Sequence, residues 1–422
     1  MATENNNKNL NVPNKREHSQ TCLGYAERKE QSPQGNVPNL RFPEFSKPYS
    51  QTTISKLATI VGGGTPDTTI QEYWNGGIQW FTPSEIGKNK YADKSERTIS
   101  QEGLNNSSAK LLPINTILLS TRATIGESSI AKEECCTNQG FQSLIANEEI
   151  VCYEYLYYLV ATLTKELIRK SCGSTFLEIS ANEIRKIKTF IPNLEEQSKV
   201  SSLLSLIDDR IATQIKIIED LKKLKNAISN LHFDTAIVNY SLVSIGDCIE
   251  QLSQRNKNGK IKEVLSVSNK NGFVNQSEQF EDREIASEDT SNYKIVRPND
   301  FAYNPARINV GSIARLHNYS CGIVSPMYVC FHTMSMLLPE YFEHFFSTSY
   351  FKHEMYKRLE GSVRLCLTYD SLCNIKIALP SINEQQQFVS QISAISSKII
   401  NEDKLLVLYQ TLKQYLLSQM FI

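Results

Sequence analysis

Apolar residues recur at intervals of three and four in two long stretches of the chain, which is the spacing of one face of an α-helix. The stretches are residues 191–235 and 379–422. The face of the first consists of Leu204, Ile207, Ile211, Ile215, Ile218, Leu221, Leu224, Ile228 and Leu231, and that of the second of Phe388, Ile392, Ile395, Ile399, Leu406 and Tyr409. Each pattern predicts a helix of roughly 40 residues, about 60 Å long at 1.5 Å per residue.

An apolar face of that length would be insoluble if it stayed exposed, so we predict that the two helices pair as a coiled coil. Polar residues interrupt the second face at Glu402 and Lys413, which favours a pairing with a fixed register. The alternative is that each helix lies in the core of a separate globular domain.

The two helices belong to an internal repeat with a shift of 188 residues. Pro192 falls on Pro380 and Glu196-Gln197 on Glu384-Gln385, and the match continues without a gap to Phe233 and Phe421. Upstream the match needs small shifts: "RATIG" at Arg122 falls opposite "RINVG" at Arg307 with a shift of 185. The earliest parts of the two halves hardly resemble each other. The pattern therefore predicts two variable fronts, each followed by a shared helix, in a pseudo-twofold arrangement.

Both fronts look like α+β domains. Residues 115–126 and 299–316 have the length, β-branched content and punctuation of strands, whereas 154–174 and 340–362 read as helices that end at glycine. We place the domains at residues 39–190 and 236–378. The Asn- and Lys-rich residues 1–38 bury too little to order themselves, so they predict a flexible tail.

Composition narrows the setting of the protein. The formal net charge of +0 gives no global field that would attract nucleic acid or a membrane, so any such surface must be a local patch. No signal peptide or membrane-spanning run is present, and a reduced cytoplasm is expected for the ten cysteines. Neither the cysteines nor the histidines have metal-site spacing. We therefore expect no metal.

The motifs form no coherent catalytic set. "VGGGTPD" lacks the endings of phosphate-binding loops, and its glycines predict a turn with positive φ. "YNPAR" at Tyr303 lacks the second proline and the aromatic of the adenine methyltransferase turn, and no methyl-donor motif precedes it. Pro66-Asp67 is not followed by the rest of a nuclease motif, and no GxSxG occurs. Two variable fronts on a repeated rod favour recognition of two different targets.

Several segments together resemble one family. "LRFPEF", "GGGTPDTTIQEYWNGGIQWFTPSEIG", "NTILLSTRATIG", "NQGF" and the duplicated Pro, Glu-Gln and long-helix element are similar to the specificity subunit of bacterial Type I restriction-modification enzymes. The resemblance extends from Asn39 to the end. It implies that each front is a target-recognition domain for one half of a split, asymmetric DNA sequence, and that the two helices pair antiparallel and hold the domains apart.

The resemblance also implies the partners. Two methyltransferase subunits would bring S-adenosylmethionine, and restriction or motor subunits would bring ATP and Mg, so that this chain itself would hold no cofactor and catalyse nothing. It would be a cytoplasmic, double-stranded DNA reader with no membrane contact. A scaffold that binds only proteins is the leading alternative, and a stand-alone methyltransferase is the second.

Phosphates are contacted by Lys and Arg, and base edges by side chains that donate and accept in pairs. The candidates in the first domain are Lys88, Lys90, Lys110, Thr121, Arg122, Gln139, Ser174 and Thr175, and those in the second are Arg255, Lys257, Lys260, Asn304, Arg307 and Arg364. Arg122 and Arg307 rank first because they are equivalent in the repeat. A solvated surface charge is the alternative for each. Trp80 and Tyr303 either stack on bases or pack inside, and packing is favoured.

Overall fold

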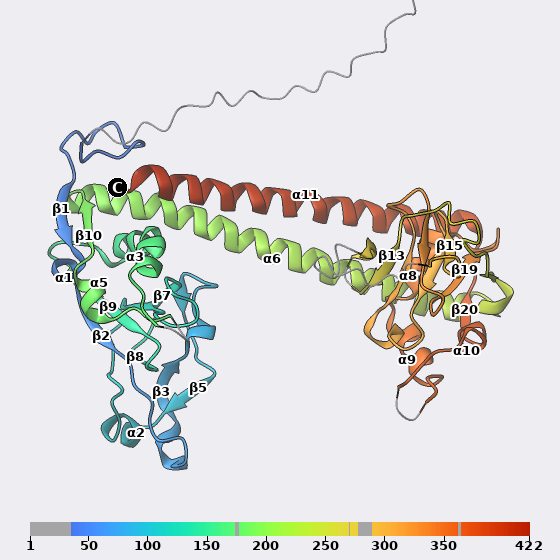
Figure 1. Ribbon diagram of the computed structural model, residues 1–422, viewed down its shortest axis with the longest axis horizontal. Helices are drawn as coiled ribbons and strands as arrows, with labels where there is room; N and C mark the ends of the chain where they lie inside the picture. The colour runs from blue at the N-terminus through green and yellow to red at the C-terminus, as the bar shows by residue number, and fades with distance from the viewer. Residues whose placement is uncertain (1–34, 174–176, 270, 277–288, 362–363) are drawn as a thin grey trace, which may run out of the picture. The chain divides into compact units, whose positions relative to one another are not determined.

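The computed structural model describes residues 35–173, 177–269, 271–276, 289–361 and 364–422 (Figure 1). Most of the predicted tail, residues 1–34, lies outside the described residues, as do Ser174 and Thr175. The chain forms two compact units. Unit 1 consists of Met1–Ser202 and Leu416–Ile422, and unit 2 of Leu203–Tyr415.

Unit 1 is built on a mixed five-stranded sheet. Its strands follow the order β2 (Ala58–Gly62), β9 (Gln142–Ala146), β6 (Ile117–Leu119), β7 (Ser128–Ala131) and β4 (Tyr91–Ala92). A second sheet has the order β5 (Arg97–Ile99), β3 (Trp74–Phe81) and β8 (Cys135–Thr137), and a strand pair joins β1 (Ser50–Thr53) to β10 (Lys188–Ile191). The helices are α1 (Ile54–Leu57), α2 (Gln101–Asn105), α3 (Tyr153–Thr162), α4 (Thr164–Arg169) and α5 (Ala181–Arg185).

Unit 2 contains a four-stranded antiparallel sheet and three strand pairs. The sheet follows the order β12 (Ile249–Leu252), β19 (Val329–Thr333), β16 (Phe301–Tyr303) and β17 (Ile313–Arg315). The pairs are β11 (Leu242–Ser244) with β20 (Lys376–Ala378), β13 (Leu265–Ser268) with β14 (Gly272–Asn275), and β15 (Lys294–Val296) with β18 (Gly322–Val324). The helices of this part are α8 (Pro339–Phe345), α9 (Ser349–Tyr356) and α10 (Tyr369–Cys373).

The two units repeat the same topology even where their sequences differ. The order β2-β9-β6-β7 in unit 1 corresponds to β12-β19-β16-β17 in unit 2, and the pair β1-β10 corresponds to β11-β20. The fronts are therefore the same fold with different side chains, although their earliest segments share no visible sequence pattern. The predicted α+β class and the internal repeat are confirmed.

The helices of the fronts are shorter than predicted. In place of the first predicted helix the described residues form α3 and α4, which are separated at Leu163, and in place of the second they form α8 and α9. The second break occurs where the Thr348 hydroxyl accepts a hydrogen bond from the Phe351 N–H and so caps a new helix.

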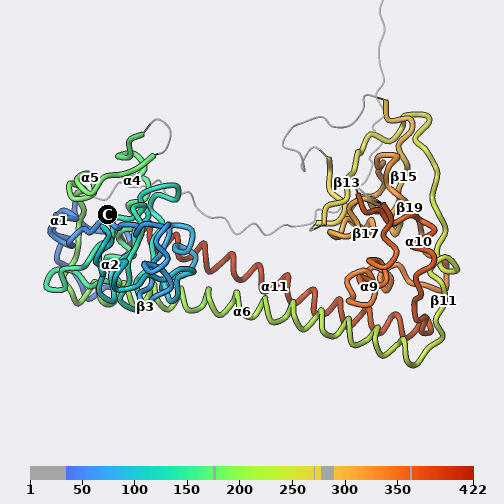
Figure 2. The backbone as a smooth tube through the Cα atoms, turned by 90° about the horizontal axis from the view of Figure 1, so that it is seen from below, coloured from blue at the N-terminus to red at the C-terminus, as the bar shows by residue number. Residues whose placement is uncertain are grey.

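Two long helices run side by side in Figures 1 and 2: α6 (Leu194–Asn239), with 46 residues, and α11 (Ile382–Met420), with 39 residues. Gln214 of α6 donates to the Glu402 carboxylate of α11, and Lys413 of α11 pairs with Asp208 of α6 at 2.6 Å. Residue numbers therefore fall along α6 as they rise along α11, so the two helices are antiparallel, as the family resemblance implies. Helix α6 ends four residues beyond the predicted residue 235.

Of the nine residues predicted for the apolar face of α6, six are buried or half-buried and three are exposed. Ile215, Leu224 and Leu231 are 41%, 49% and 68% exposed. Buried and half-buried positions instead alternate by three and four residues, the spacing of a coiled-coil seam: Leu204, Ile207, Ile211, Gln214, Ile218, Leu221, Lys225, Ile228 and His232. Polar Gln214 and His232 contact α11 at Glu402 and Phe388, whereas half-buried Lys225 lies near Glu343 and His344 of α8. An apolar pattern cannot reveal these polar positions.

A repeated glutamine attaches each long helix to its unit. The Gln197 amide donates to the carbonyls of Ile150 and Pro192 and accepts from the Cys152 N–H. Its repeat mate, Gln385, donates to the carbonyls of Met336 and Pro380 and accepts from the Leu338 N–H. The Glu-Gln motif therefore recurs because both units need the same three hydrogen bonds.

The end of α11 packs into unit 1. Phe421 stacks on Tyr155 with ring centroids 5.0 Å apart, and the Tyr49 hydroxyl donates to the Met420 carbonyl. Arg41, in the segment "LRFPEF", makes a two-pronged contact with Glu196, with nitrogen–oxygen distances of 2.7 Å. Residues from both ends of the described chain thus stabilise one unit.

Candidate nucleic-acid interface

The glycine-rich loop of unit 1 is held by two tryptophans. The Trp80 indole N–H donates to the Gly64 carbonyl at 2.9 Å, and the Trp74 indole N–H to the Asp67 carbonyl at 3.0 Å. The predicted positive φ was wrong, because none of the three glycines has one. Close packing explains them instead: a Cβ on Gly63 would lie 2.0 Å from the Asn138 carbonyl oxygen. Trp80 is buried, so it packs rather than stacks on a base.

This loop meets two other loops that carry predicted site residues. The Thr65 hydroxyl donates to the Gln139 side-chain oxygen at 2.6 Å. This bond uses the oxygen of the exposed Gln139 side chain and not its NH₂ group. The N–H and the hydroxyl of Thr121 both bond to the Gly140 carbonyl. Thr121 is fully buried, so its hydroxyl positions the loop and does not reach a base. The fold thus brings Arg122 and Gln139 into neighbouring loops, with Thr121 buried beneath them.

Arg122 sits on a tight and strained turn of this loop. Ala123 has a φ of 57°, a backbone region that L-residues other than glycine seldom occupy. The Arg122 carbonyl accepts from the Thr124 N–H at 2.6 Å and from the Ser120 hydroxyl at 2.9 Å. The Arg122 guanidinium pairs with Glu178 at 2.7 Å, and half of the arginine side chain remains exposed. The turn therefore presents the guanidinium at the surface.

The lysines predicted for unit 1 differ in their surroundings. Lys88 and Lys110 are exposed. Lys90 is not available, because it pairs with Glu154 at 2.9 Å and its side chain is only 8% exposed. The Lys90 ammonium also lies over the Tyr158 ring. Lys90 is thus a structural cation between a loop and α3, and sequence alone gives no sign of that partner.

In unit 2 the matching loop joins β16 to β17 and contains Asn304 and Arg307. The Pro305 carbonyl accepts from the Leu367 N–H at 3.1 Å, which places this loop against the segment that follows Arg364. Arg307 and Arg364 are exposed, and neither has an ion pair with a described residue. The structure therefore brings three predicted residues into one region. Tyr303 is buried and donates to the Leu367 carbonyl, so it packs.

Arg255, Lys257 and Lys260 lie on a different loop, after β12. Buried Asn256 shapes this loop by donating to the Ile261 carbonyl at 2.8 Å. Arg255 donates to the Asn292 side chain at 2.9 Å, and both lysines are exposed. The hydrogen bonds among the described residues do not connect this group to Asn304 or Arg307.

Two exposed residues beside these loops were not predicted. The Arg97 guanidinium lies 3.6 Å from the Trp74 ring centroid, a contact that depends on the pairing of β3 with β5. Met327 is 63% exposed and its sulfur lies 3.8 Å from the Asn304 amide nitrogen. The exposure of Met327 could have been predicted from the sequence only if the pairing register of β19, which begins two residues later, had been known.

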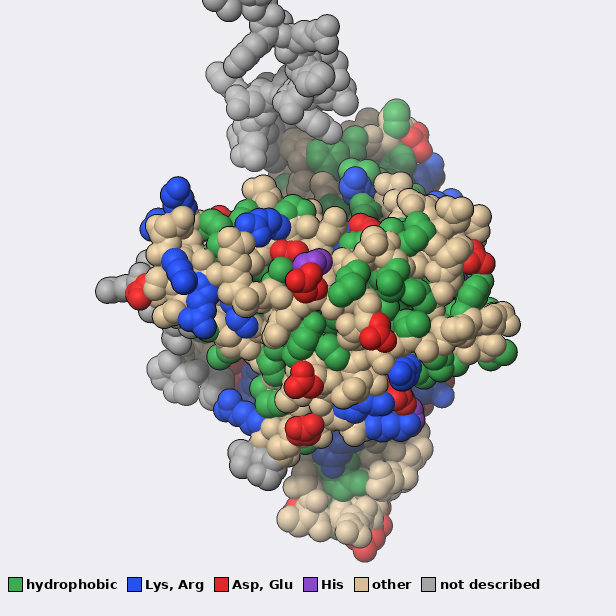
Figure 3. All heavy atoms as spheres, turned by 90° about the vertical axis from the view of Figure 1, so that its right-hand side faces the viewer, with side chains coloured by type: hydrophobic (Ala, Val, Ile, Leu, Met, Phe, Trp, Pro, Cys, Tyr) green, Lys and Arg blue, Asp and Glu red, His purple; other side chains and the backbone are tan. Residues whose placement is uncertain are grey.

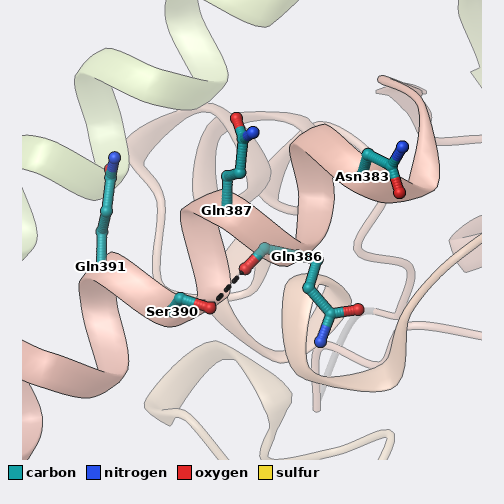
Figure 4. Close-up of a pocket in the computed structure, with 5 residues that line it drawn as sticks. All are labelled: Asn383, Gln386, Gln387, Ser390 and Gln391. Carbon is teal, nitrogen blue, oxygen red and sulfur yellow. Dashed lines mark hydrogen bonds between the residues drawn. The ribbon is translucent and has the colours of Figure 1, made fainter.

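The described residues contain no cluster of three or more His, Cys, Asp or Glu side chains that could hold a metal ion. One shallow hollow among the described residues is lined by uncharged polar side chains of α11 (Figure 4): Asn383, Gln386, Gln387, Ser390 and Gln391. The Ser390 hydroxyl there donates to the Gln386 carbonyl. The hollow thus offers neither an acid–base pair nor an activated nucleophile.

Burial raises the pKa of the Cys135 thiol to about 12 and that of the Cys136 thiol to about 11, so both stay protonated. No helix in the part of the chain that the structure describes is long and apolar enough to cross a bilayer. On the face drawn in Figure 3, Lys and Arg gather in separate groups, with acidic and apolar side chains between them. Charge is therefore local, as the zero net charge predicts.

Comparison with known proteins matches the first half of the chain to a known family. Residues 47–223 match the family model of the Type I restriction modification DNA specificity domain. The Type I restriction enzyme MjaIX specificity subunit of Methanocaldococcus jannaschii is 37% identical over 185 residues, which are 43% of this chain and 43% of that protein. The EcoR124I/EcoR124II specificity subunit of Escherichia coli is 29% identical over 163 residues, 37% of this chain and 40% of that protein. The chain thus spans less than half the length of these relatives.

Solved structures extend the likeness in fold to most of the chain. The S subunit of a Type I restriction-modification system from M. genitalium has a TM-score of 0.52 at 15% identity and covers 92% of this chain and 99% of its own. A chain from a Type I system studied for complex assembly has a TM-score of 0.56 at 14% identity and covers 88% of this chain and 97% of its own. The resemblance predicted from the motifs is confirmed: the chain is similar to Type I restriction-modification specificity subunits, and its residues 47–223 match their DNA specificity domain.

Proposed function

We propose that the chain is the DNA-sequence recognition subunit of a Type I restriction-modification complex and reads a bipartite, asymmetric target. One observation carries the proposal. Both units place an arginine on the loop between two neighbouring antiparallel strands of the strand order that they share, β6 to β7 in unit 1 and β16 to β17 in unit 2. The specificity-domain match to residues 47–223 includes the first of these loops.

The surroundings of the two loops favour different target bases. Arg122 is joined by Gln139 and Thr65, whereas Arg307 is joined by Asn304 and Met327. Base edges are distinguished by the donors, acceptors and apolar groups that face them. Two readers with the same fold and different side chains would therefore read two different half-sites, which makes the target asymmetric.

The partners follow from the family resemblance. Methyltransferase subunits would supply S-adenosylmethionine and the methylating site, and restriction or motor subunits would supply ATP- and Mg-dependent cleavage in the cytoplasm. In this proposal the present chain contributes DNA recognition and a scaffold, and no catalytic step. Exposed apolar residues of α6 and α11, such as Leu224 and its repeat mate Leu412, are available to such partners.

The test is modified-base sequencing of genomic DNA from the native host, with the gene intact and with it deleted. The proposal expects a split motif carrying N6-methyladenine that disappears on deletion. The motif would report both half-sites and the gap between them. Unchanged methylation in a host whose partner subunits are expressed would reject the reader role and favour a scaffold that binds only proteins. Binding of labelled S-adenosylmethionine by the purified chain alone would favour the stand-alone methyltransferase.

A further inference from the structure

We infer that Glu178 is a positioning residue that orients Arg122 to read a guanine in the half-site of unit 1. The inference rests on the proposed function and adds an assignment within it: Arg122 selects a base, whereas Arg307 in unit 2 contacts the phosphate backbone. Four observations carry it, namely the backbone around Glu178, the turn at Arg122, the ion pair between them and the absence of a carboxylate at the matching position of unit 2.

The backbone of Glu178 is held on both sides. It forms antiparallel bridges with Cys172 and with Arg122. The two hydrogen bonds with Cys172 measure 2.9 and 3.0 Å, and the next residue, Ile179, donates from its N–H to the Thr121 carbonyl at 3.3 Å. The carboxylate therefore projects from a fixed strand-like segment beside the Arg122 loop, although residues 174–176 lie outside the described part.

Arg122 is fixed from its own side by the turn at Ala123 and by the two hydrogen bonds to its carbonyl. Its contact with Glu178 joins one terminal nitrogen to one carboxylate oxygen at 2.7 Å. An exposed ion pair adds little stability, so its structural value is small. What the pair does is restrict a long and otherwise mobile side chain to one direction.

Unit 2 has a similar bridged segment without the acid. With the shift of 188 residues, Cys366 falls on Glu178, and it bridges Glu360 just as Glu178 bridges Cys172. Leu367, which falls on Ile179, donates to the Pro305 carbonyl, one residue before the position that matches Thr121, and the described residues of unit 2 show no bridge between Arg307 and Cys366. Unit 2 thus has a cysteine, Cys366, where unit 1 has the carboxylate of Glu178. Among the described residues Arg307 has no ion-pair partner. Arg307 is free to follow a phosphate.

The chemistry of guanidinium explains the assignment. The group has five N–H donors in a rigid fork, so a carboxylate oxygen on one nitrogen leaves others for a second partner. The two neighbouring acceptors that suit this fork in the major groove are O6 and N7 of guanine. A fork held in one direction recognises that pair, whereas an unrestrained arginine is satisfied by any phosphate.

The experiment expresses the full chain with its native methyltransferase subunits in a host that lacks the system, and reads the methylated motif by modified-base sequencing. Glu178→Gln is expected to relax one guanine position of one half-site, with a loss of about 5- to 150-fold in discrimination. Arg122→Lys is expected to relax the same position. Arg307→Lys is expected to keep the motif and to lower only the fraction of sites methylated.

Glu183→Gln is the matched control, because Glu183 is a surface acid of unit 1 that pairs with Lys186 at 2.8 Å; its motif is expected to be unchanged. A wild-type split motif that stays fully intact in Glu178→Gln overturns the inference and leaves the proposed function standing. Relaxation of different positions by Glu178→Gln and Arg122→Lys also overturns it. If Glu178→Gln abolishes methylation, Arg122→Lys decides: an unchanged motif rejects the inference, and a relaxed guanine supports it.

Discussion

At the scale of single residues, two glutamines connect the α+β units to the long helices. Gln385 is buried and makes three hydrogen bonds to backbone groups of the loop before α8 and of Pro380. Gln385→Leu would leave these groups buried without partners, which costs about 1–3 kcal/mol. We expect a lower midpoint for denaturant unfolding, followed by circular dichroism.

The neighbouring Gln386 provides the control, because its side chain is exposed on the same helix. Gln386→Leu is expected to leave the midpoint nearly unchanged. Equal losses in the two variants would show that hydrogen bonding of Gln385 does not hold the helix to its unit.

A histidine gives unit 2 a dependence on pH. Burial, and then the nearby Lys225 and Arg315, lowers the pKa of His344 to about 4 from an ordinary value of 6.5. The unfolded chain therefore binds a proton that the folded chain rejects. The stability that this histidine contributes is complete above pH 6.5 and is lost as the pH falls towards 4.

We expect the difference in unfolding free energy between wild type and His344→Gln to shrink steadily from pH 6.5 to pH 4. Thermal unfolding at half-unit pH steps measures it. His353→Gln, at an exposed position of α9, is the comparison variant and should follow the wild type throughout. Parallel curves for wild type and His344→Gln would reject the role of His344.

At the scale of elements, the antiparallel pair of α6 and α11 has a polar contact at its pseudo-twofold position. Gln214 and Glu402 are separated by 188 residues, the shift of the repeat, and they contact each other. Polar groups in a coiled-coil seam fix register and partner at a cost in stability. Glu402 also pairs with Lys398. The polar contact at the centre of the seam therefore fixes the register of the two helices and adds little to the stability of their pairing.

Replacing both residues in the variant Gln214→Leu with Glu402→Leu is expected to raise the thermal unfolding midpoint by several degrees, because apolar packing replaces buried polar groups. The same variant should form dimers or other misaligned species, which analytical ultracentrifugation detects. Glu402→Gln keeps hydrogen-bonding capacity and should sediment like the wild type. A lower midpoint in the double variant would mean that the polar pair is a net source of stability.

At the scale of the whole molecule, the proposed function makes helix length a ruler for the gap between half-sites. We predict that seven residues added after Leu221, with a matching seven between Ser397 and Lys398 of α11, lengthen the unread gap by about three base pairs. The estimate is about 10 Å of helix, at 1.5 Å per residue, against about 3.4 Å per base pair. Whole heptads keep the seam in register. Modified-base sequencing reads the new gap.

A seven-residue insertion in α6 alone is the control. Because only one helix lengthens, the seam cannot keep its register on both sides of the insertion, and methylation should fall sharply. An unchanged gap in the doubly lengthened protein would show that helix length does not set the distance between the half-sites.

The balance of charge bears on DNA binding by the isolated chain. Positive and negative side chains are equal in number over the chain, 45 each, so little surplus remains to grip phosphates. We expect the purified chain to bind its own target weakly at physiological salt and more tightly with the methyltransferase subunits. Fluorescence anisotropy over a salt series measures both. Tight binding by the chain alone would contradict the expectation.

The sequence by itself determined the parts of this protein that have a period or a repeat. The two long helices and their pairing follow from apolar spacing, the α+β fronts from strand-like and helix-like segments, and the Glu-Gln element from the shift of 188 residues, whereas the antiparallel direction was implied by the family resemblance. These features are local, or are written twice, so a linear reading finds them. Arg122 and Arg307 were also identified in this way, as equivalents before a glycine.

Only the tertiary structure decided which polar side chains lie where. Gln214 and His232 contact α11, and Lys225 is half-buried near α8, whereas the apolar Ile215, Leu224 and Leu231 beside them are exposed. The partner helix and the packed unit, not hydrophobicity alone, decide which positions are buried. Lys90 forms an ion pair with Glu154, which is 64 residues away in sequence. The shared sheet of the two fronts was likewise hidden, because backbone hydrogen bonds define strand order and leave the side chains free to differ.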